Sequence, residues 1–226
     1  MAGLTALTRP AAGRPAGMLV LIHGRGADER DLAPLADALD PERRLVAALP
    51  RGPLSRPPGG AHWYAVHEIG RPDPGTFRPT FATASAWLDE TAATHDVPLD
   101  RVVLAGFSQG AVMSFALGLA RDRPPPAAIV ALSGFVPEVP GFEVDLPARR
   151  NLPVAIGHGT LDPVIGVEFG RRARDLLQAA GLDVRYRESP MGHAIDPGFL
   201  AELRGWLAEV VSARPEPAPR TDDAYA

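Results

Sequence analysis

The 226-residue sequence contains no cysteine and no lysine. The absence of cysteine excludes disulfides, thiolate nucleophiles and metal sites built on Cys ligands. All 23 basic residues are arginine, and the net charge of −4 argues against a general nucleic-acid or anionic-membrane surface. No apolar run reaches the ~18 residues of a membrane span, and residues 1–17 lack the pattern of a signal peptide. These absences predict a cytoplasmic protein without integral membrane association.

The residues that are present indicate a single globular domain. Apolar residues make up 46% of the chain and charged residues 22%, a composition too apolar for a disordered protein. One α/β domain is expected at this length. We predict an N-terminal segment over 1–17 with at most a short edge strand, a domain over 18–212, and a disordered tail over 213–226, which is rich in proline and charge.

Strand and helix patterns alternate through the domain. Short apolar runs predict strands near 18–22, 44–49, 101–107, 127–132, 154–156 and 184–186. Helical spacing of apolar residues predicts helices near 32–39, 81–95, 110–119, 167–180 and 199–210. Asp28 and Asp31 are candidate N-caps of the first helix. Buried strands that alternate with helices are typical of the α/β class, here a doubly wound, mostly parallel sheet with helices on both faces.

One long connection, residues 50–80, has no steady period and is rich in proline and glycine. Connections of this length without secondary structure are usually functional or mobile. His62, Trp63 and Tyr64 lie within it, and we expect them to line a substrate pocket. His23 is a further candidate for substrate contact, and we expect it to be a buried, hydrogen-bonded support for its loop and not an acid or base. The alternative for the two aromatic residues is that they fill core space beneath the loop.

The sequence Gly106-Phe107-Ser108-Gln109-Gly110 lies where a β-branched run meets a helical pattern. A Gly-x-Ser-x-Gly motif in this context is typical of a nucleophile elbow, in which the serine occupies a sharp strand-to-helix turn. A serine hydroxyl is a weak nucleophile at neutral pH and needs a histidine base oriented by a carboxylate. Ser108 is therefore the candidate nucleophile.

Two strand ends downstream supply the partners that Ser108 needs. Asp162 follows the penultimate predicted strand and His193 the last one, so the order Ser–Asp–His is that of α/β-hydrolases. The carboxyl ends of parallel strands share one edge of the sheet, where active sites form. The alternatives are a turn aspartate before Pro163 and a surface histidine. His158 is placed in a Gly-His-Gly turn without a catalytic role.

An ester hydrolase also needs donors for the oxyanion. The backbone N–H of Gln109, directly after the nucleophile, is the first candidate. The second is the N–H of Arg25, because the glycine-rich turn His23-Gly24-Arg25-Gly26 follows an early strand and lets backbone approach a bound carbonyl oxygen.

These motifs together resemble the phospholipase/carboxylesterase family of α/β-hydrolases, which includes bacterial carboxylesterases and acyl-protein thioesterases. The resemblance covers Leu21–Asp28, Gly106–Gly110, His158–Val164 and Gly192-His193, in order along most of the domain. It implies a Ser108, His193 and Asp162 triad with an oxyanion hole from the Arg25 and Gln109 amides. Arg25 stands where thioesterases of the family usually have leucine, a departure that concerns acyl specificity.

The resemblance implies a serine carboxylesterase that hydrolyses short to medium acyl esters through a covalent acyl-enzyme. The alternatives are an acyl-protein thioesterase or a lysophospholipase, with Arg25 meeting an anionic head group. A more remote alternative is a non-catalytic ligand-binding protein on the same fold. We expect no metal and no cofactor, a small-molecule ester as partner, no nucleic acid, and a monomer or homodimer.

Overall fold

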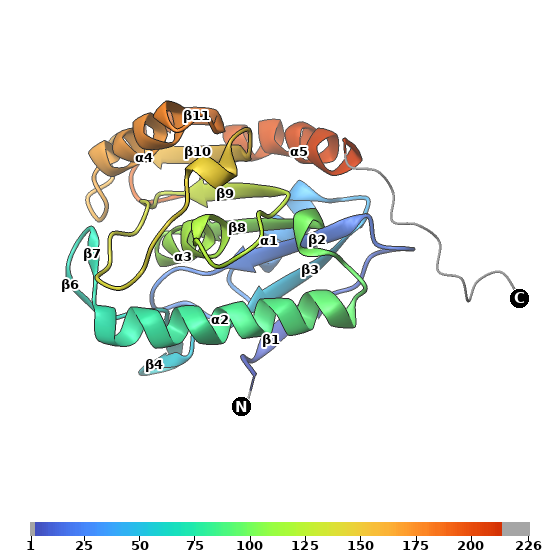
Figure 1. Ribbon diagram of the computed structural model, residues 1–226, viewed down its shortest axis with the longest axis horizontal. Helices are drawn as coiled ribbons and strands as arrows, with labels where there is room; N and C mark the ends of the chain where they lie inside the picture. The colour runs from blue at the N-terminus through green and yellow to red at the C-terminus, as the bar shows by residue number, and fades with distance from the viewer. Residues whose placement is uncertain (1–2, 214–226) are drawn as a thin grey trace, which may run out of the picture.

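The computed structural model describes residues 3–213 and is built around one seven-stranded sheet (Figure 1). The strand order is β1-β3-β2-β8-β9-β10-β11. The edge strand β1 pairs antiparallel with β3, and all other pairs are parallel. The strands are β1 (Ala6–Arg9), β2 (Gly17–Ile22), β3 (Leu45–Pro50), β8 (Val102–Phe107), β9 (Ala128–Leu132), β10 (Pro153–Gly159) and β11 (Asp183–Ser189).

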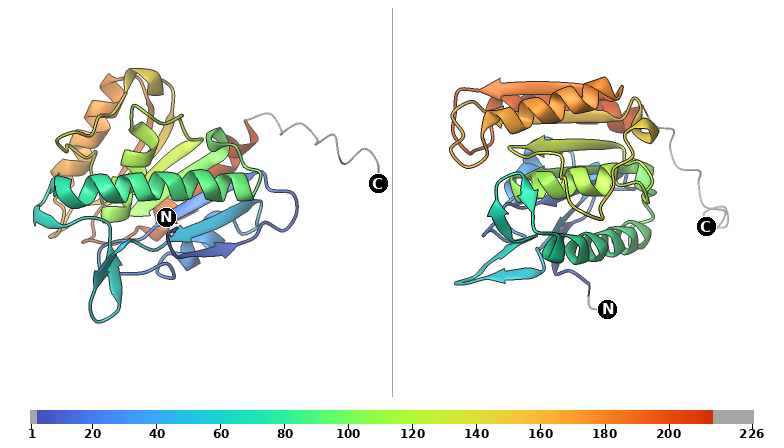
Figure 2. Two further views of the ribbon diagram at one scale, coloured as in Figure 1. Left: turned by 60° about the horizontal axis from the view of Figure 1, so that its bottom comes forward. Right: turned by 60° about the vertical axis from the view of Figure 1, so that its left-hand side comes forward.

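Helices cover both faces of the sheet, as the α/β prediction requires. On one face lie α1 (Ala33–Leu39) and α5 (Pro197–Ser212), whose apolar side chains share one core cluster. On the other face lie α2 (Pro74–Thr94), α3 (Gln109–Leu119) and α4 (Val167–Ala179). The long α2 crosses in front of the sheet (Figure 2). The doubly wound fold of a single α/β domain is confirmed.

The central strands of the sheet are continuous apolar runs because both faces of the sheet are buried. Met18, Val20 and Ile22 of β2 point into the core beneath α2 and α3, whereas Leu19 and Leu21 point into the core beneath α1 and α5. Successive side chains of a strand alternate between faces, so a strand buried on both sides needs an unbroken apolar sequence.

The prediction of an irregular loop over 50–80 is wrong. The segment forms two hairpins and the start of a helix: β4 (Leu54–Arg56) pairs with β5 (Gly60–His62), and β6 (Val66–Glu68) with β7 (Arg71–Pro72). Helix α2 begins at Pro74 and not near Phe81. Its N-cap Asp73 accepts a hydrogen bond from the Thr76 N–H at 2.9 Å, and Pro74 occupies the first turn, where proline is tolerated.

Three smaller predictions also need correction or fall outside the structure. Helix α1 has Leu32 at its N-cap without a side-chain cap, while Asp28 accepts a hydrogen bond from the Arg30 N–H instead. Strand β10 extends through Gly159, so His158 belongs to a strand, paired with Glu188 of β11, and not to a turn. Of the predicted disordered tail over 213–226, residues 214–226 lie outside the described residues.

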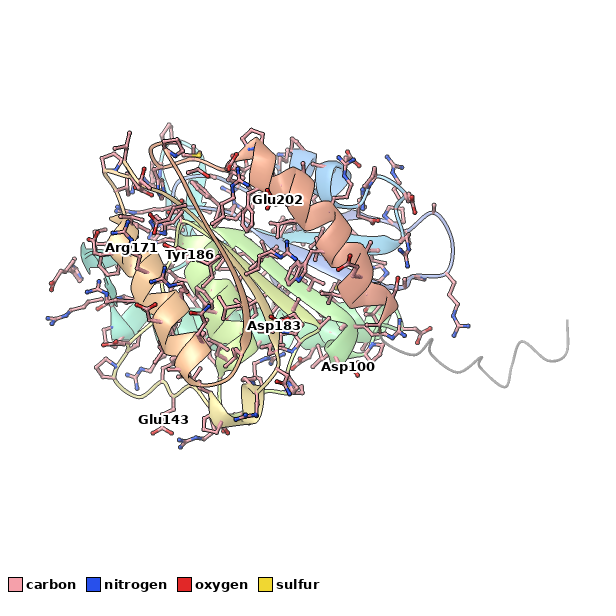
Figure 3. All side chains as sticks on the ribbon, turned by 90° about the horizontal axis from the view of Figure 1, so that it is seen from above. Asp100, Glu143, Arg171, Asp183, Tyr186 and Glu202 are labelled. Carbon is pink, nitrogen blue, oxygen red and sulfur yellow. The ribbon has the colours of Figure 1, made fainter. Side chains whose placement is uncertain are left out.

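The edge strand β11 is covered by a network of charged side chains (Figure 3). Arg171 of α4 donates two hydrogen bonds to the Glu188 carboxylate at 2.8 and 2.7 Å, and the Tyr186 hydroxyl donates a third at 3.0 Å. The Arg171 hydrogen bond holds the pKa of Glu188 at about 2. Paired charges on an edge strand oppose pairing with a second chain. None of the helices in the described part of the chain is long and apolar enough to cross a membrane.

Candidate active site

Ser108 occupies a strained turn between β8 and α3. Its φ of 56° and ψ of −120° lie in a region that non-glycine residues rarely adopt. Hydrogen bonds on both sides impose this conformation: the Ser108 N–H donates to the Leu132 carbonyl at 2.9 Å, and the Ser108 carbonyl accepts from the N–H groups of Ala111 and Val112. The sharp strand-to-helix turn that the sequence predicts at Ser108 is therefore present.

The two glycines of the motif let the backbones on either side of Ser108 approach one another. A Cβ on Gly110 would collide with the Ile22 carbonyl oxygen of β2, and a Cβ on Gly106 would collide with the backbone of Gly110. Both obstacles are main-chain atoms that cannot rotate away. The position of Ser108 at the end of the sheet thus depends on these glycines.

We expect Gly110→Ala to lower the free energy of unfolding by at least about 3 kcal/mol, because the methyl group displaces α3 from β2 in a close-packed core. Chemical denaturation monitored by circular dichroism measures this. Gly205→Ala is the matched control, since a Cβ at this position in α5 meets no atom within 4 Å. The control should be neutral or stabilising, and equal stability of both variants would contradict the packing described.

The turn after β2 lies against Ser108. A Cβ on Gly24 would stand 3.4 Å from the Ser108 Cβ. Gly26, with φ of 89°, occupies the third position of a β-turn closed by the Ala27 N–H and the Gly24 carbonyl. Strand β5 holds the turn from outside, since the Gly26 N–H donates to the Ala61 carbonyl at 2.7 Å and the Ala61 N–H to the Ala27 carbonyl at 2.8 Å.

The backbone N–H groups of Arg25 and Gln109 differ from those of their neighbours in having no hydrogen-bond acceptor among the described residues. Within residues 3–213 neither N–H donates to a protein acceptor, whereas the Gly26, Ala27 and Ser108 amides all do. The Gln109 donor directly follows Ser108, and the Arg25 donor lies in the turn packed against Ser108. Two fixed, unpaired backbone donors beside a serine are the arrangement that an oxyanion needs.

Asp162 and His193 meet at the carboxyl ends of β10 and β11. The distance from Asp162 Oδ2 to His193 Nδ1 is 2.7 Å. The other carboxylate oxygen, Oδ1, accepts hydrogen bonds from the N–H groups of Val164 at 2.8 Å and Ile165 at 2.9 Å. Burial raises the pKa of Asp162, but the hydrogen bonds from His193 and the two amides outweigh it and hold the pKa below its ordinary value. Asp162 is therefore ionised at neutral pH.

The His193 ring also lies next to the elbow. Its centroid is 4.7 Å from that of Phe107, the residue before Ser108. No hydrogen bond joins Ser108 Oγ to His193 in the part of the chain that the structure describes. Catalytic hydrogen bonds are often long without substrate and tighten in the complex. The structure thus brings Asp162 and His193 into direct contact and places Ser108 beside them.

His158 is a residue whose role sequence reasoning missed. Its side chain is fully buried, with Nε2 at 2.8 Å from the Ile165 carbonyl oxygen and 3.7 Å from Asp162 Oδ2. Donation from Nε2 to Ile165 fixes the turn whose amides bind Asp162. The sequence does contain a feature that predicts this role. His158 lies four residues before Asp162, at the end of the strand that Asp162 follows.

His23, Trp63 and Tyr64, predicted to contact substrate, are instead buried, with at most 2% of each residue exposed. His23 Nε2 accepts from the Gly52 N–H at 3.0 Å, so Nδ1 carries the proton and donates to the Gly24 carbonyl. Burial lowers the pKa of His23 and keeps the ring neutral. The Trp63 indole N–H donates to the His23 carbonyl at 2.9 Å. The structure thus shows His23 as a buried, hydrogen-bonded support of its loop and Trp63 and Tyr64 in the core beneath the hairpins, which is the alternative to a pocket lining.

The Gln109 side chain joins this buried layer to the elbow. Its Oε1 accepts from the Trp63 N–H at 3.0 Å, and its Nε2 donates to the Tyr64 carbonyl at 2.9 Å. Both main-chain groups are buried and depend on this one amide. The residue that supplies a backbone donor to the candidate oxyanion hole thus also anchors the segment in front of it.

We expect Gln109→Met to lower the free energy of unfolding by about 2–4 kcal/mol, because it leaves a buried N–H and a buried carbonyl without partners at ~1–3 kcal/mol each. Methionine has a similar volume, so the change isolates the hydrogen bonds. Urea denaturation measures the loss. Gln178→Met, at an exposed position of α4, is the control and should be nearly neutral. Stability equal to that of the control would refute the anchoring role.

Residues 3–213 contain no cluster of three or more His, Asp or Glu side chains that could hold a metal ion. The groups that the structure brings together are a serine hydroxyl, a histidine–carboxylate pair and two amide donors, the set that acyl transfer requires.

Comparison with known proteins agrees with this geometry. Residues 6–211 match the family described as Phospholipase/Carboxylesterase. Acyl-protein thioesterase 1 of Debaryomyces hansenii is 31% identical over 160 residues, which cover 66% of this chain and 67% of that protein. Acyl-protein thioesterase 1 of Candida albicans is 28% identical over 92% of this chain and 98% of its own.

Solved structures show the same architecture. Esterase PE8 superposes with a TM-score of 0.81 at 27% identity, over 92% of this chain and all of that one. The Bacillus cereus carboxylesterase superposes with a TM-score of 0.80 over 92% of this chain and 94% of its own. At 22% identity the second likeness concerns the fold alone.

Proposed function

The chain belongs to the phospholipase/carboxylesterase family of α/β-hydrolases, and on that premise we propose that it is a serine carboxylesterase with Ser108 as its nucleophile. His193 is the general base and Asp162 its orienting carboxylate. The observation that carries the proposal is the 2.7 Å contact between Asp162 and His193 beside the strained turn at Ser108. A strained serine next to a half-buried histidine held by a buried carboxylate suits acyl transfer.

The reaction follows from the positions of the donors and acceptors. Ser108 Oγ attacks the ester carbonyl carbon while His193 Nε2 takes the hydroxyl proton. The N–H groups of Arg25 and Gln109 donate to the oxyanion of the tetrahedral intermediate. His193 returns the proton to the leaving alcohol as the C–O bond breaks, which leaves Ser108 acylated. Water, deprotonated by His193, then attacks the acyl-enzyme and releases the acid.

Asp162 gives His193 the tautomer that this sequence of steps needs. A carboxylate at Nδ1 requires that nitrogen to carry the proton, so Nε2 presents a lone pair to the serine. The same carboxylate stabilises the imidazolium that forms during attack. All groups of the proposed mechanism come from the chain, so the reaction needs neither metal nor cofactor.

For the substrate, we propose small carboxylic esters with short to medium acyl chains, hydrolysed in the cytoplasm by a monomer or homodimer. The proposal includes no nucleic-acid partner. The curated relatives named as acyl-protein thioesterases make thioester hydrolysis the alternative, and a lysophospholipase or a non-catalytic binding protein are more remote ones.

Matched oxyesters and thioesters of increasing acyl length distinguish these functions. We expect initial rates to be highest for short oxyesters and to fall as the acyl chain lengthens. Higher kcat/KM for long acyl thioesters would favour the thioesterase instead. An absence of turnover on every substrate would favour a binding protein.

A further inference from the structure

The rim of the proposed active site carries two arginines without a carboxylate partner. Arg25 lies in the turn after β2, Arg56 ends β4, and both side chains are exposed. No ion pair joins either guanidinium to an acidic residue within the described part of the chain. Arg51, by contrast, pairs with Glu29 at 3.1 Å and lies 3.8 Å from Asp28. The carboxylates of Asp28 and Glu29 therefore lie next to Arg51, and the charges of Arg25 and Arg56 at the rim are not neutralised by them.

The β4–β5 hairpin brings these two arginines to the same place. It projects away from the central sheet (Figure 2), and its strand β5 bonds to the turn that contains Arg25. Gly60 packs against the Gly26 carbonyl so closely that a Cβ would collide with it. The Arg56 Cδ stands 3.6 Å from where a Gly26 Cβ would lie. The stem of Arg56 thus crosses the residue next to Arg25.

His62, at the end of β5, completes the group. His62 pairs with Leu54 across the hairpin and Arg56 pairs with Gly60, so the side chains of His62 and Arg56 lie on the same face. Burial first, and then the charges of Arg25 and Arg56, lower the pKa of His62. The neutral ring has a buried Nδ1 without a hydrogen-bond partner among the described residues. Buried polar atoms of proteins are as a rule hydrogen-bonded, so an unpartnered one is a candidate contact for a bound group. The free guanidiniums of Arg25 and Arg56 in the same hairpin and turn favour an anion as the group bound there.

We propose that Arg25, Arg56 and His62 form a subsite for an anionic group on the substrate. The preferred esters then carry carboxylate or phosphate oxygens a few bonds from the reacting carbonyl. This inference rests on the proposed function, because the amide of Arg25 would hold the oxyanion while its side chain binds the anion of the same molecule. Guanidinium groups bind carboxylate and phosphate through paired, charge-assisted hydrogen bonds.

The test compares two esters that differ in one charge: the mono-4-nitrophenyl ester of glutaric acid and its neutral methyl diester analogue. We expect Arg25→Gln and Arg56→Gln each to lower the ratio of kcat/KM, anionic over neutral, by about fivefold, the effect of an exposed ion pair. Added salt should lower the same ratio in the wild type. Arg185→Gln, exposed on β11, is the control and should leave the ratio unchanged. Unchanged ratios in both rim variants would overturn the subsite.

A binding measurement separates this inference from the proposed function. Glutarate is titrated by calorimetry into the Ser108→Ala protein and into the same protein with Arg25→Gln and Arg56→Gln added. We expect the two arginine changes to weaken binding by tenfold or more. Such weakening without ester turnover by the wild type would uphold the subsite and refute the hydrolase. Turnover without any effect of the arginines on rates or binding would refute the subsite and leave the hydrolase.

Discussion

Ser108→Ala is expected to lower kcat for ester hydrolysis by about 10⁶-fold, on the order of the loss found when a serine nucleophile is removed. The variant retains the oxyanion donors and the binding surface, so it should keep a rate above that of water alone. Its free energy of unfolding should change by less than about 1 kcal/mol, since the hydroxyl makes no hydrogen bond within residues 3–213 and the change removes a single atom.

The matched control for this variant is Ser114→Ala. Ser114 is also buried in α3, where its hydroxyl donates to the Gly110 carbonyl at 3.0 Å. Its loss should cost about 1 kcal/mol of stability and leave kcat within a few-fold of the wild type. Steady-state rates with a nitrophenyl ester measure both variants. Equal losses of activity in the two variants would mean that packing in α3, and not a nucleophile, limits the reaction.

Asp162→Asn should lower kcat by about 10⁴-fold while the fold persists, because it inverts the tautomer of His193. Oδ1 of Asp162 accepts from the amides of Val164 and Ile165, so the oxygen of an asparagine must occupy that position. Its NH₂ group then faces His193 Nδ1 and donates to it. The proton of the ring moves to Nε2, which can no longer accept the proton of Ser108.

Asp196→Asn is the control for this change. Asp196 follows β11, three residues after His193. Its carboxylate accepts hydrogen bonds from Ser189 Oγ at 2.5 Å and Arg187 Nε at 3.0 Å, and it caps α5 by accepting from the Gly198 N–H. We expect a loss of about 1 kcal/mol in stability from the weakened cap and almost full activity. Measured kcat for both variants decides the assignment. If Asp196→Asn were the inactive one, Asp162 would not be the orienting carboxylate.

The sequence predicts best where one physical requirement dominates. Strand β2 is unbroken apolar sequence because both faces of the sheet are buried there. The turn at Ser108 is predictable because a Cβ at Gly106 or Gly110 would collide with main-chain atoms, so both positions require glycine. The edge strand β1 was expected within residues 1–17, and it forms at Ala6–Arg9.

Prediction fails where local composition competes with tertiary contacts. Prolines and glycines over 50–80 suggest a loop, yet the segment forms hairpins because β5 bonds to the turn at Gly26, a contact that only the folded chain provides. The aromatic character of Trp63 and Tyr64 predicts a pocket lining, yet both side chains are buried. Their burial depends on Gln109, which lies more than 40 residues away in sequence and contacts both main chains.

Among the proposed catalytic residues, too, some are predictable from the sequence and others depend on tertiary contacts. Chain order and strand ends suffice to nominate Asp162 and His193, because parallel strands bring their carboxyl ends to one edge. They do not reveal His158, since its role depends on a contact with the Ile165 carbonyl across a turn. They also do not place Arg56 near Arg25, since only the β4–β5 hairpin of the folded chain brings the two arginines together.

The central claim, that Ser108 is an activated nucleophile, is tested most directly with a fluorophosphonate probe, which bonds covalently to activated serines. The labelled protein is measured by intact mass and then by peptide mapping. We predict a single adduct on the peptide that contains Ser108, blocked by a competing ester and absent from Ser108→Ala. An adduct on another residue, or full ester hydrolysis by a protein whose Ser108 stays unlabelled, would contradict the account.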